Sequence, residues 1–400
     1  MKQGTRPLIV GAGPVGMGAA LFLAKRGIAT RIINQSASPS PHSRALAVNP
    51  RTLEILEPTG ITEAMLRLGL PIHGVRLWRE DGPCAELRFE ALKHKYPFML
   101  ALSQSTSEWL LAEALAAQGQ TIERGTSLVT CRNGIDGVYL ELRRAPDNAR
   151  EALRVPWVLA ADGAHSTVRR QVDVRFRGRG FPKPWHLVDV PLDATLDSEL
   201  AHVFFLAEGF VFVIRVINDI RKDSAGAPVW RVMSNLTDPV GRIKLLQPTG
   251  PPVWSSTFHV SHGVNDTLQA GCICFAGDAA HLHSPAGARG MNLGLEDAWV
   301  FSQLAQADAV EGYGHLRKKV DQRVVARIER LSRVAGGESA LMRVMRSVMT
   351  RWLVKVPMVR RQMLATVTGL DHPLEQPRTD IVPPGPSIRT PFENKAGSQA

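Results

Sequence analysis

Short runs of consecutive apolar residues, each followed by a turn that contains glycine, recur at three distant places in the chain. They lie at residues 7–10, 157–161 and 271–276. Apolar runs of this length, bounded by turn residues, are typical of strands buried on both faces of a parallel sheet. After the first run, a helix is predicted at 17–25, ending at Gly27, and a second strand at 30–33. The first 35 residues therefore predict a strand–helix–strand unit.

Beyond this unit, the pattern alternates between helical and strand periodicity. Further helices are predicted at 109–117 and 165–172, and strands of a meander at 127–132 and 138–144. From about 175 to 268 aromatic-rich strand patterns dominate, at 202–207, 210–216 and 229–235. We expect these strands to form the antiparallel sheet of an inserted substrate domain. After the strand at 271–276, the chain is predicted to be helical to about 368.

The predicted fold class is α/β, with a Rossmann-like first domain, an inserted antiparallel-sheet domain and C-terminal helices. A length of 400 residues exceeds what one domain usually needs, which agrees with two domains. The first domain is assigned to 1–72, 99–174 and 269–335, and the substrate domain to 73–98 and 175–268. The C-terminal helices are assigned to 336–372, and a proline-rich tail to 373–400.

Composition removes several classes of protein. The four cysteines are scattered and form no CxxC pair, so neither a disulfide framework nor a metal site is predicted. The N-terminus enters a strand directly, without the apolar segment of a secretion signal, which favours a cytoplasmic protein. The formal net charge is +11, but no nucleic-acid-binding motif accompanies it, so we expect no nucleic-acid partner.

The positive charge is concentrated near the C-terminus. Residues 311–370 contain 13 basic and 4 acidic residues. Leu341, Met345, Val348 and Trp352 recur there at helical spacing, with arginine and lysine between them. We expect an amphipathic helix that packs this apolar stripe against the core and turns a basic face outward. The alternatives are a weak contact with a membrane surface, which suits a lipophilic substrate, and a helix that binds a partner protein.

A glycine motif follows the first predicted strand. Gly11, Gly13 and Gly16 form GxGxxG at the point where the strand turns into a helix. Such glycines permit a tight turn and let the backbone approach a pyrophosphate, whose charge then lies at the helix N-terminus. The motif predicts dinucleotide binding. The ribose-binding acid usual in such domains is replaced by Asn34, which lowers the expected affinity by about 1 kcal/mol, roughly fivefold.

Two further motifs follow the other buried strands. ADGAHSTVR at 161–169 contains Asp162, and FAGDAAH at 275–281 contains Gly277 and Asp278. Ligands of open α/β sheets bind at these carboxyl ends of the strands. Capping of a helix by either carboxylate is an equally good interpretation. PAGARGMN at 285–292 then opens a long helix, whose free amides suit a developing negative charge.

With GAGPVG, DGAHSTVR and GDAAH followed by PAGARGMNLGLEDA, the chain resembles the flavoprotein aromatic hydroxylases, which are para-hydroxybenzoate hydroxylase-like monooxygenases, from residue 7 to about 370. The resemblance implies a glutathione-reductase-like FAD domain and a substrate sheet over the flavin ring. It also implies reduction of the flavin by NADPH or NADH, in agreement with the absence of a second GxGxxG. The implied FAD-binding residues are Gly11, Gly13, Gly16, Asn34, Arg44, Gln104, Asp162, Gly277, Asp278, Pro285, Gly290, Met291 and Asn292. Ala288 and Arg289 depart from the more usual glycine and glutamine.

The implied reaction is hydroxylation of an aromatic or polycyclic small molecule with O2, through a C4a-hydroperoxyflavin. The catalytic residue is left unknown, with His202, Arg215 and Tyr96 as candidates. His281 and His283 are further histidines near the glycine turns. In 210–216, one of the two alternating faces should line the cavity, either Phe210, Phe212 and Ile214 or Val211, Val213 and Arg215. Two rival functions stay open, a flavin oxidase, dehydrogenase or reductase on the same scaffold, and a non-catalytic flavin-binding relative.

Overall fold

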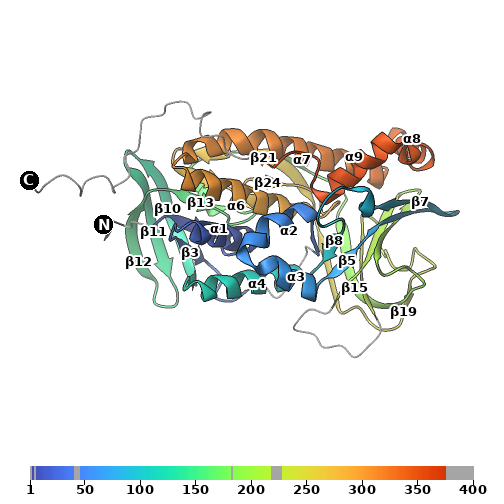
Figure 1. The fold of residues 1–400 in the computed structure, drawn as a ribbon, viewed down its shortest axis with the longest axis horizontal. Coiled ribbons are helices and arrows are strands. Elements are labelled where there is room, and N and C mark those ends of the chain that lie inside the picture. Colours follow the sequence, from blue (N-terminus) through green and yellow to red (C-terminus); the bar gives the residue numbers. More distant parts are fainter. Residues whose placement is uncertain (1, 4–5, 40–45, 182, 218–227, 375–400) are drawn as a thin grey trace, which may run out of the picture.

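The computed structural model describes residues 2–3, 6–39, 46–181, 183–217 and 228–374 (Figure 1). Its central sheet is parallel apart from one edge pair and has the order β22-β23-β13-β2-β3-β9. The strands are β2 Leu8–Val10, β3 Arg31–Asn34, β9 Ile122–Arg124, β13 Val158–Ala160, β22 Gln269–Ala270 and β23 Ile273–Phe275. The three short apolar runs of the sequence thus become the adjacent central strands β2, β13 and β23.

Helices and a second sheet enclose this central sheet. Helices α1 Pro14–Lys25, α4 Gln104–Ala117 and α6 Gly290–Gln306 pack side by side, with α1 between the other two. A meander packs against the same core and contains β10 Thr126–Gly134, β11 Gly137–Arg144 and β12 Ala149–Val155, with β1 Lys2–Gln3 at its edge. Figure 1 shows this meander at the end of the molecule opposite α8. These layers form the dinucleotide-binding architecture that the motifs predict.

A larger sheet forms the other half of the molecule. Its order is β19-β15-β18-β17-β16-β6-β7, with β20 also paired to β15. The strands are β6 Gly74–Arg79, β7 Gly82–Arg88, β15 Trp185–Asp193, β16 Leu200–Leu206, β17 Gly209–Arg215, β18 Val229–Ser234, β19 Gln247–Pro248 and β20 Trp254–Phe258. All neighbours are antiparallel except β16 and β6. The antiparallel sheet expected from the aromatic-rich strands is therefore present, and two segments far apart in the sequence build it.

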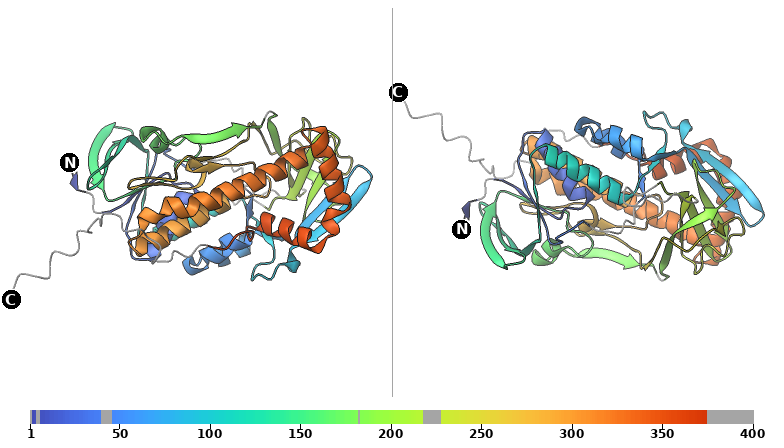
Figure 2. Two further views of the ribbon diagram at one scale, coloured as in Figure 1. Left: turned by 90° about the horizontal axis from the view of Figure 1, so that it is seen from above. Right: turned by 90° about the horizontal axis from the view of Figure 1, so that it is seen from below.

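Two small sheets and the remaining helices connect the halves. The small sheets contain β4 Ala47–Val48, β5 Leu70–Ile72 and β8 Met99–Ala101, and β14 Phe176–Gly180, β21 Ser261–Asn265 and β24 His281–Leu282. The remaining helices are α2 Pro50–Leu56, α3 Ile61–Leu68, α5 Thr167–Gln171, α7 Tyr313–Gly336, α8 Ala340–Arg351 and α9 Pro357–Thr368, with short 3-10 turns η1 Glu57–Thr59, η2 Phe89–Ala91, η3 Gly277–Ala279, η4 Val310–Gly312 and η5 Leu353–Lys355. Figure 2 shows α7 running along the molecule from the central-sheet half to the substrate-sheet half.

Several element boundaries differ from the predicted ones. Helix α1 begins at Pro14, inside the expected turn, because proline is favoured in the first turn of a helix. Helix α4 begins five residues early, at Gln104, because the Ser103 hydroxyl caps it and accepts a hydrogen bond from the amide of Thr106. The chain is not helical directly after β23, where it forms η3 and the short strand β24. Most of the predicted tail lies outside the described residues.

The expected packing of the helix at 340–351 is wrong. Leu341 and Met345 of its apolar stripe are 65% and 46% exposed, and Trp352 at its end is 70% exposed. Arg346 is buried instead and donates hydrogen bonds to the backbone carbonyls of Gly209 and Ala335. The buried arginine, rather than the apolar stripe, therefore fixes the rotation of α8.

No helix within the described ranges combines the length and the apolar character that crossing a membrane requires.

Candidate functional site

One cavity of about 1000 Å³ extends between the two halves of the molecule. At one end it is lined by Gly13, Pro14 and Val15, where α1 begins. At the other end it reaches the apolar face of the large sheet and the inner sides of α7 and α9. A dinucleotide-binding turn and an apolar chamber therefore share one continuous space.

The three glycines of the first motif have different structural reasons. Gly11 has a φ of +105°, and a Cβ there would lie 2.3 Å from the carbonyl oxygen of Ala161. A Cβ on Gly16 would lie 1.9 Å from the carbonyl oxygen of Gly11. A Cβ on Gly13, by contrast, meets no atom of the described residues within 4 Å. Gly11 and Gly16 are thus required by the turn itself, whereas the space at Gly13 is open toward the cavity.

Two helices begin at the cavity without a side-chain cap in the described part of the chain. Helix α1 has Gly13 as its N-cap, and α6 has Arg289, and neither has an acidic residue in its first turn. Pro285, Gly290 and Met291 line the cavity. Backbone amides at such helix starts attract negative charge, because the helix dipole adds to their hydrogen bonds. This arrangement fits the phosphates of an FAD molecule and the negative charge that its ring gains on reduction.

The loop before α6 contains Ala288, the first of the two residues that depart from the usual glycine and glutamine. Ala288 has a φ of +52°, a left-handed conformation that favours glycine. The side-chain amide of Asn292 is fully buried and donates to the carbonyl of Ala47, while its oxygen accepts from the amide of Asn49. The side chain of Asn292 therefore fastens the first turn of α6 to the segment before α2.

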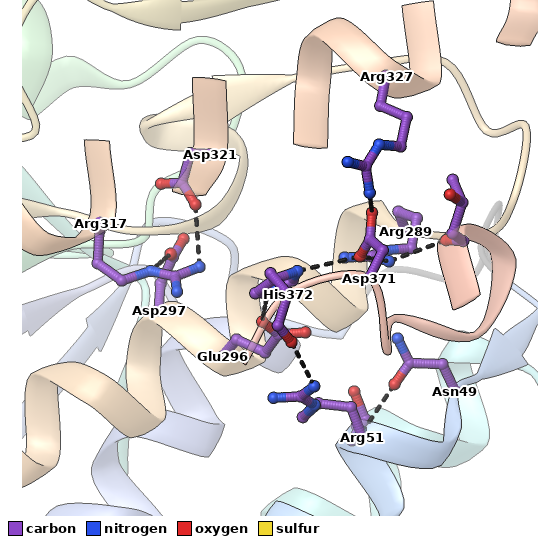
Figure 3. A network of polar contacts seen from close by, with 12 residues as sticks. Asn49, Arg51, Arg289, Glu296, Asp297, Arg317, Asp321, Arg327, Asp371 and His372 are labelled. Carbon is purple, nitrogen blue, oxygen red and sulfur yellow. Dashed lines mark hydrogen bonds and ion pairs between the residues drawn. The ribbon is translucent and has the colours of Figure 1, made fainter. Parts of the chain in front are cut away.

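Arg289 enters a buried ionic network with the C-terminal end of the described chain (Figure 3). Its Nη1 lies 3.0 Å from the carboxylate of Asp371, which also accepts from Arg327, and 2.9 Å from the carbonyl oxygen of Thr366. Beside them, His372 Nε2 lies 2.7 Å from Glu296 of α6. Burial raises the pKa of Asp371, but His372 and Arg289 outweigh it and hold the pKa well below its usual range. Asp371 is therefore a carboxylate that anchors the segment after α9 to the start of α6.

The two strand-end carboxylates differ in exposure and in role. Asp162 Oδ2 accepts hydrogen bonds from the amides of Thr167 and Val168, at 2.6 and 3.1 Å, and so caps α5. Its Oδ1 is buried without a hydrogen-bond partner among the described residues, and burial raises its pKa. Asp278 is exposed at the cavity wall, in the turn that Gly277 permits with a φ of +58°. Of the two, Asp278 is placed to meet a ligand.

Two other predicted cofactor residues can be located. Gln104 lines the cavity at the start of α4, where its amide donates to Glu108. Asn34 ends β3 and is partly exposed, with a long 3.4 Å hydrogen bond from its amide to the carbonyl of Ser36. Arg44 lies outside the described residues.

Replacing Asn34 by aspartate should raise FAD affinity about fivefold, because a charged acceptor binds a ribose hydroxyl about 1 kcal/mol better than an amide. Flavin-fluorescence titration of the apoprotein measures the dissociation constant. Asn34→Ala provides the opposite arm and should weaken binding. Equal affinities in all three proteins would remove Asn34 from the cofactor site.

One of the two alternating faces of strand β17 lines the cavity, as the sequence predicts. Phe210, Phe212 and Ile214 line the cavity, whereas Val211 and Val213 are buried in a separate cluster behind the sheet. Arg215 is partly exposed on that rear face. The assignment of Arg215 to the substrate is therefore not supported, because strand alternation turns it away from the cavity.

An arginine that the sequence analysis missed lines the cavity instead. The strand register pairs Ile214 with Arg231, which places both on one face of the sheet. Arg231 lines the cavity, and its Nε and Nη2 donate to the two oxygens of Asp189, each at 2.8 Å. Its only sequence signal is a charged residue in the strand pattern at 229–235, since the register cannot be derived from one strand.

His202 and Tyr96 are not brought to the cavity either. His202 is fully buried, accepts a hydrogen bond from Trp78 Nε1 and lies 2.8 Å from the carbonyl of Asp197. Burial lowers its pKa, so the ring is neutral. The Tyr96 hydroxyl donates to Glu57 at 2.5 Å, and its ring packs in the core of the central-sheet half. Both side chains are committed to structural contacts.

Two histidines after β23 have opposite pKa shifts. His283 lines the cavity, and burial lowers its pKa to about 3, which makes it neutral at physiological pH. His281 Nε2 lies 2.8 Å from Asp297, whose other oxygen pairs with Arg317, and Arg317 also binds Asp321. His281, Asp297 and Asp321 come close enough to hold a metal ion, but the guanidinium of Arg317 supplies the positive charge between the two carboxylates. The cluster is best described as a buried ion-pair network, of which Figure 3 shows Arg317 with Asp297 and Asp321.

The His281 pair predicts a pH dependence of stability. Burial lowers the pKa of His281, but Asp297 and Asp321 outweigh it and raise the pKa from 6.5 to about 9. The folded protein therefore keeps a proton that the unfolded chain releases, so this stabilisation is complete below pH 6.5 and is lost as the pH rises through 9. Urea unfolding between these pH values should show a falling free energy of unfolding. His281→Gln should reduce that slope and leave the part that comes from His372, whose pKa Asp371 and Glu296 raise against the effect of burial. An unchanged slope would contradict the assignment.

Comparison with known proteins agrees with this geometry. Residues 5–327 match the family of FAD binding domains. The chain is 36% identical over 328 residues to 6-methylpretetramide 4-monooxygenase of Streptomyces rimosus, and 28% identical over 337 residues to pentachlorophenol 4-monooxygenase of Sphingobium chlorophenolicum. These matches cover 78% and 80% of this chain, but only 57% and 62% of the two relatives. The crystal structure of p-nitrophenol 4-monooxygenase from Pseudomonas putida DLL-E4 superimposes with a TM-score of 0.81 at 23% identity, covering 93% of this chain and 99% of the other.

Proposed function

Because the chain belongs to the family of FAD binding domains, we propose that it is an FAD-dependent monooxygenase that hydroxylates an aromatic or polycyclic small molecule, using NADPH or NADH and O2. The observation that carries the proposal is the continuous cavity that joins the glycine turn to the apolar chamber. The names of the two relatives, one a pretetramide and one a phenol monooxygenase, support this substrate class.

The residues around the cavity fit the cofactor. The open space at Gly13 and the amides of α1 would hold the pyrophosphate, and Asp278 would bind the hydroxyls of the flavin side chain. The amides at the start of α6, near Met291, would stabilise negative charge on the flavin ring. When bound and reduced, FAD supplies the activation of O2 for transfer of one oxygen atom to an electron-rich ring.

The chain itself binds and orients the substrate. Phe205, Phe210 and Phe212 form an apolar wall that excludes water and packs against aromatic rings. Arg231 adds a guanidinium group to that wall, held in place by its ion pair with Asp189. This combination favours a ring system that carries a phenolic or other electron-rich oxygen. Neutral His283 can accept a hydrogen bond from a substrate hydroxyl, but its lowered pKa makes it a poor acceptor of the proton itself.

Incorporation of labelled oxygen tests the proposal. The FAD-loaded protein is given NADPH, ¹⁸O2 and a panel of phenols and polycyclic quinones, and the products are analysed by mass spectrometry. A monooxygenase puts one ¹⁸O atom into the product for each NADPH consumed. NADPH oxidation with release of peroxide alone, for every compound, would favour an oxidase or reductase. Tight FAD binding without any NADPH oxidation would favour a non-catalytic flavin protein.

Two neighbouring residues provide a matched pair for the substrate chamber. Phe212→Ala should raise the KM for an accepted substrate about tenfold, because the ring loses a contact of roughly 1–1.5 kcal/mol. Arg215→Ala should leave KM unchanged, because Arg215 lies on the other face of the same strand. Equal effects of the two substitutions would mean that the substrate binds elsewhere.

A further inference from the structure

The outer surface of α8 carries an apolar stripe that the fold leaves uncovered. Leu341, Val344, Met345, Val348 and Trp352 fall at the three- and four-residue spacings of one helix face, and are between 44% and 70% exposed. Exposed stripes of this kind on a helix are uncommon in soluble domains and usually mark an interaction surface. Just beyond α8 in the sequence, Met358 at the start of α9 is 83% exposed as well. We call these six residues the α8 face.

The orientation of α8 is held from the inside. The guanidinium of Arg346 is buried and donates to the carbonyls of Leu206, Gly209 and Ala335. Turning the apolar stripe inward would pull this charge out of three hydrogen bonds and bury other cations without partners. The α8 face is therefore directed outward by a specific set of contacts. Figure 1 shows α8 at the end of the molecule opposite the N-terminus.

Positive charge borders the α8 face. Residues 339–370 contain six basic residues and no acidic one. Arg343, Arg351, Lys355 and Arg361 are exposed. The segment 339–370 therefore combines exposed apolar side chains, a tryptophan among them, with basic residues and no acidic one. This is the composition of helices that lie in the interface of anionic membranes.

The charge distinguishes between the kinds of partner. A second copy docked symmetrically through this face would bring two sets of cations against each other. A nucleic acid would match the charge but would leave Trp352, Val344 and Leu341 without an apolar partner. A bilayer with negatively charged headgroups matches both properties. We infer that the α8 face docks the protein on an anionic lipid surface, peripherally and without spanning it.

The docked helices would also border the substrate cavity. Met349 of α8 and Gln362 and Met363 of α9 line it from the inner side. Docking would place the cavity beside the bilayer, where a lipophilic polycyclic substrate accumulates. This role in substrate uptake rests on the proposed function. The outer face would select the membrane, and the inner face would meet the substrate.

Co-sedimentation with vesicles tests the docking step without using turnover. The FAD-loaded protein is mixed with vesicles of phosphatidylcholine alone or with added phosphatidylglycerol, at low and high salt. We expect binding about tenfold stronger or more to the anionic vesicles, weakened by salt. Because the assay needs no substrate, its result is independent of the labelled-oxygen experiment.

Matched variants locate the contact. Trp352→Ser and Arg351→Glu should each lower vesicle binding about tenfold, since one loses apolar area and the other reverses a charge. The controls are Trp109→Ser on α4, where the side chain is 44% exposed, and Arg143→Glu on β11, which is also exposed. Neither control should change binding. Circular dichroism of all four variants excludes misfolding as the cause of a loss.

Three outcomes would overturn the inference. Binding that is equally weak for neutral and anionic vesicles would remove the membrane as partner. Binding that the α8 variants leave unchanged would move the contact to another surface. Self-association that Trp352→Ser abolishes, without vesicle binding, would assign the α8 face to a second copy of the chain.

Discussion

Replacing Asp371 by asparagine should lower the free energy of unfolding by about 3–5 kcal/mol, because it leaves a buried charge without its partner. Arg289 is fully buried, and Asp371 is the carboxylate that it contacts. The same carboxylate also accepts from Arg327 and from His372. Urea denaturation followed by circular dichroism measures the loss.

Two controls isolate the buried pair. Glu63→Gln breaks the ion pair with Arg67, whose side chains are 81% and 65% exposed, and should cost less than about 1 kcal/mol. The double variant Arg289→Gln with Asp371→Asn removes both charges and should recover much of the lost stability. Similar costs for Asp371→Asn and Glu63→Gln would show that the segment after α9 is not anchored by this pair.

Replacing Gly13 by alanine should weaken FAD binding about 100-fold while leaving the unfolding temperature of the apoprotein unchanged. A Cβ at this position meets no described atom within 4 Å, and its φ of −79° suits any residue. The methyl group would instead stand where the backbone approaches the pyrophosphate, and it would cost charge-assisted hydrogen bonds worth roughly 3 kcal/mol. Flavin titration and calorimetry measure the two properties separately.

Gly11→Ala is the matched comparison. Its φ of +105° and the 2.3 Å approach to Ala161 mean that the apoprotein itself should be destabilised. The two substitutions therefore separate a glycine required by the ligand from one required by the chain. Unchanged FAD affinity of Gly13→Ala would show that the pyrophosphate lies elsewhere.

The sequence predicts the strand, the turn and the helix around Gly11, Gly13 and Gly16, because these local elements are encoded within a few residues. It also predicts that one face of the strand at 210–216 lines a cavity, and Phe210 and Phe212 confirm this. The cofactor roles of the individual site residues stay predictions. So do the domain boundaries.

Long-range geometry accounts for what the sequence does not reveal. Alternation divides a strand into two faces, but only the neighbouring strands decide which face meets the cavity. Strand periodicity alone therefore offers Arg215 as a candidate, whereas the register with β17 places Arg231 at the cavity. In the same way, α8 has the periodicity of a core helix, but the hydrogen bonds of Arg346 to distant carbonyls turn it over. Arg289 finds Asp371 across 82 residues of sequence, which no local pattern indicates.

The order of strands in the central sheet has a consequence for biosynthesis. Strands β2, β13 and β23 are neighbours in space, but β23 is made more than 260 residues after β2. During translation the first strands must therefore wait for most of the chain to leave the ribosome before the sheet closes. Such non-local closure is slow and leaves apolar strand surface exposed to aggregation in the meantime. Nascent chains that end before β23 should accordingly depend on chaperones, and the cofactor should bind only after the sheet is complete.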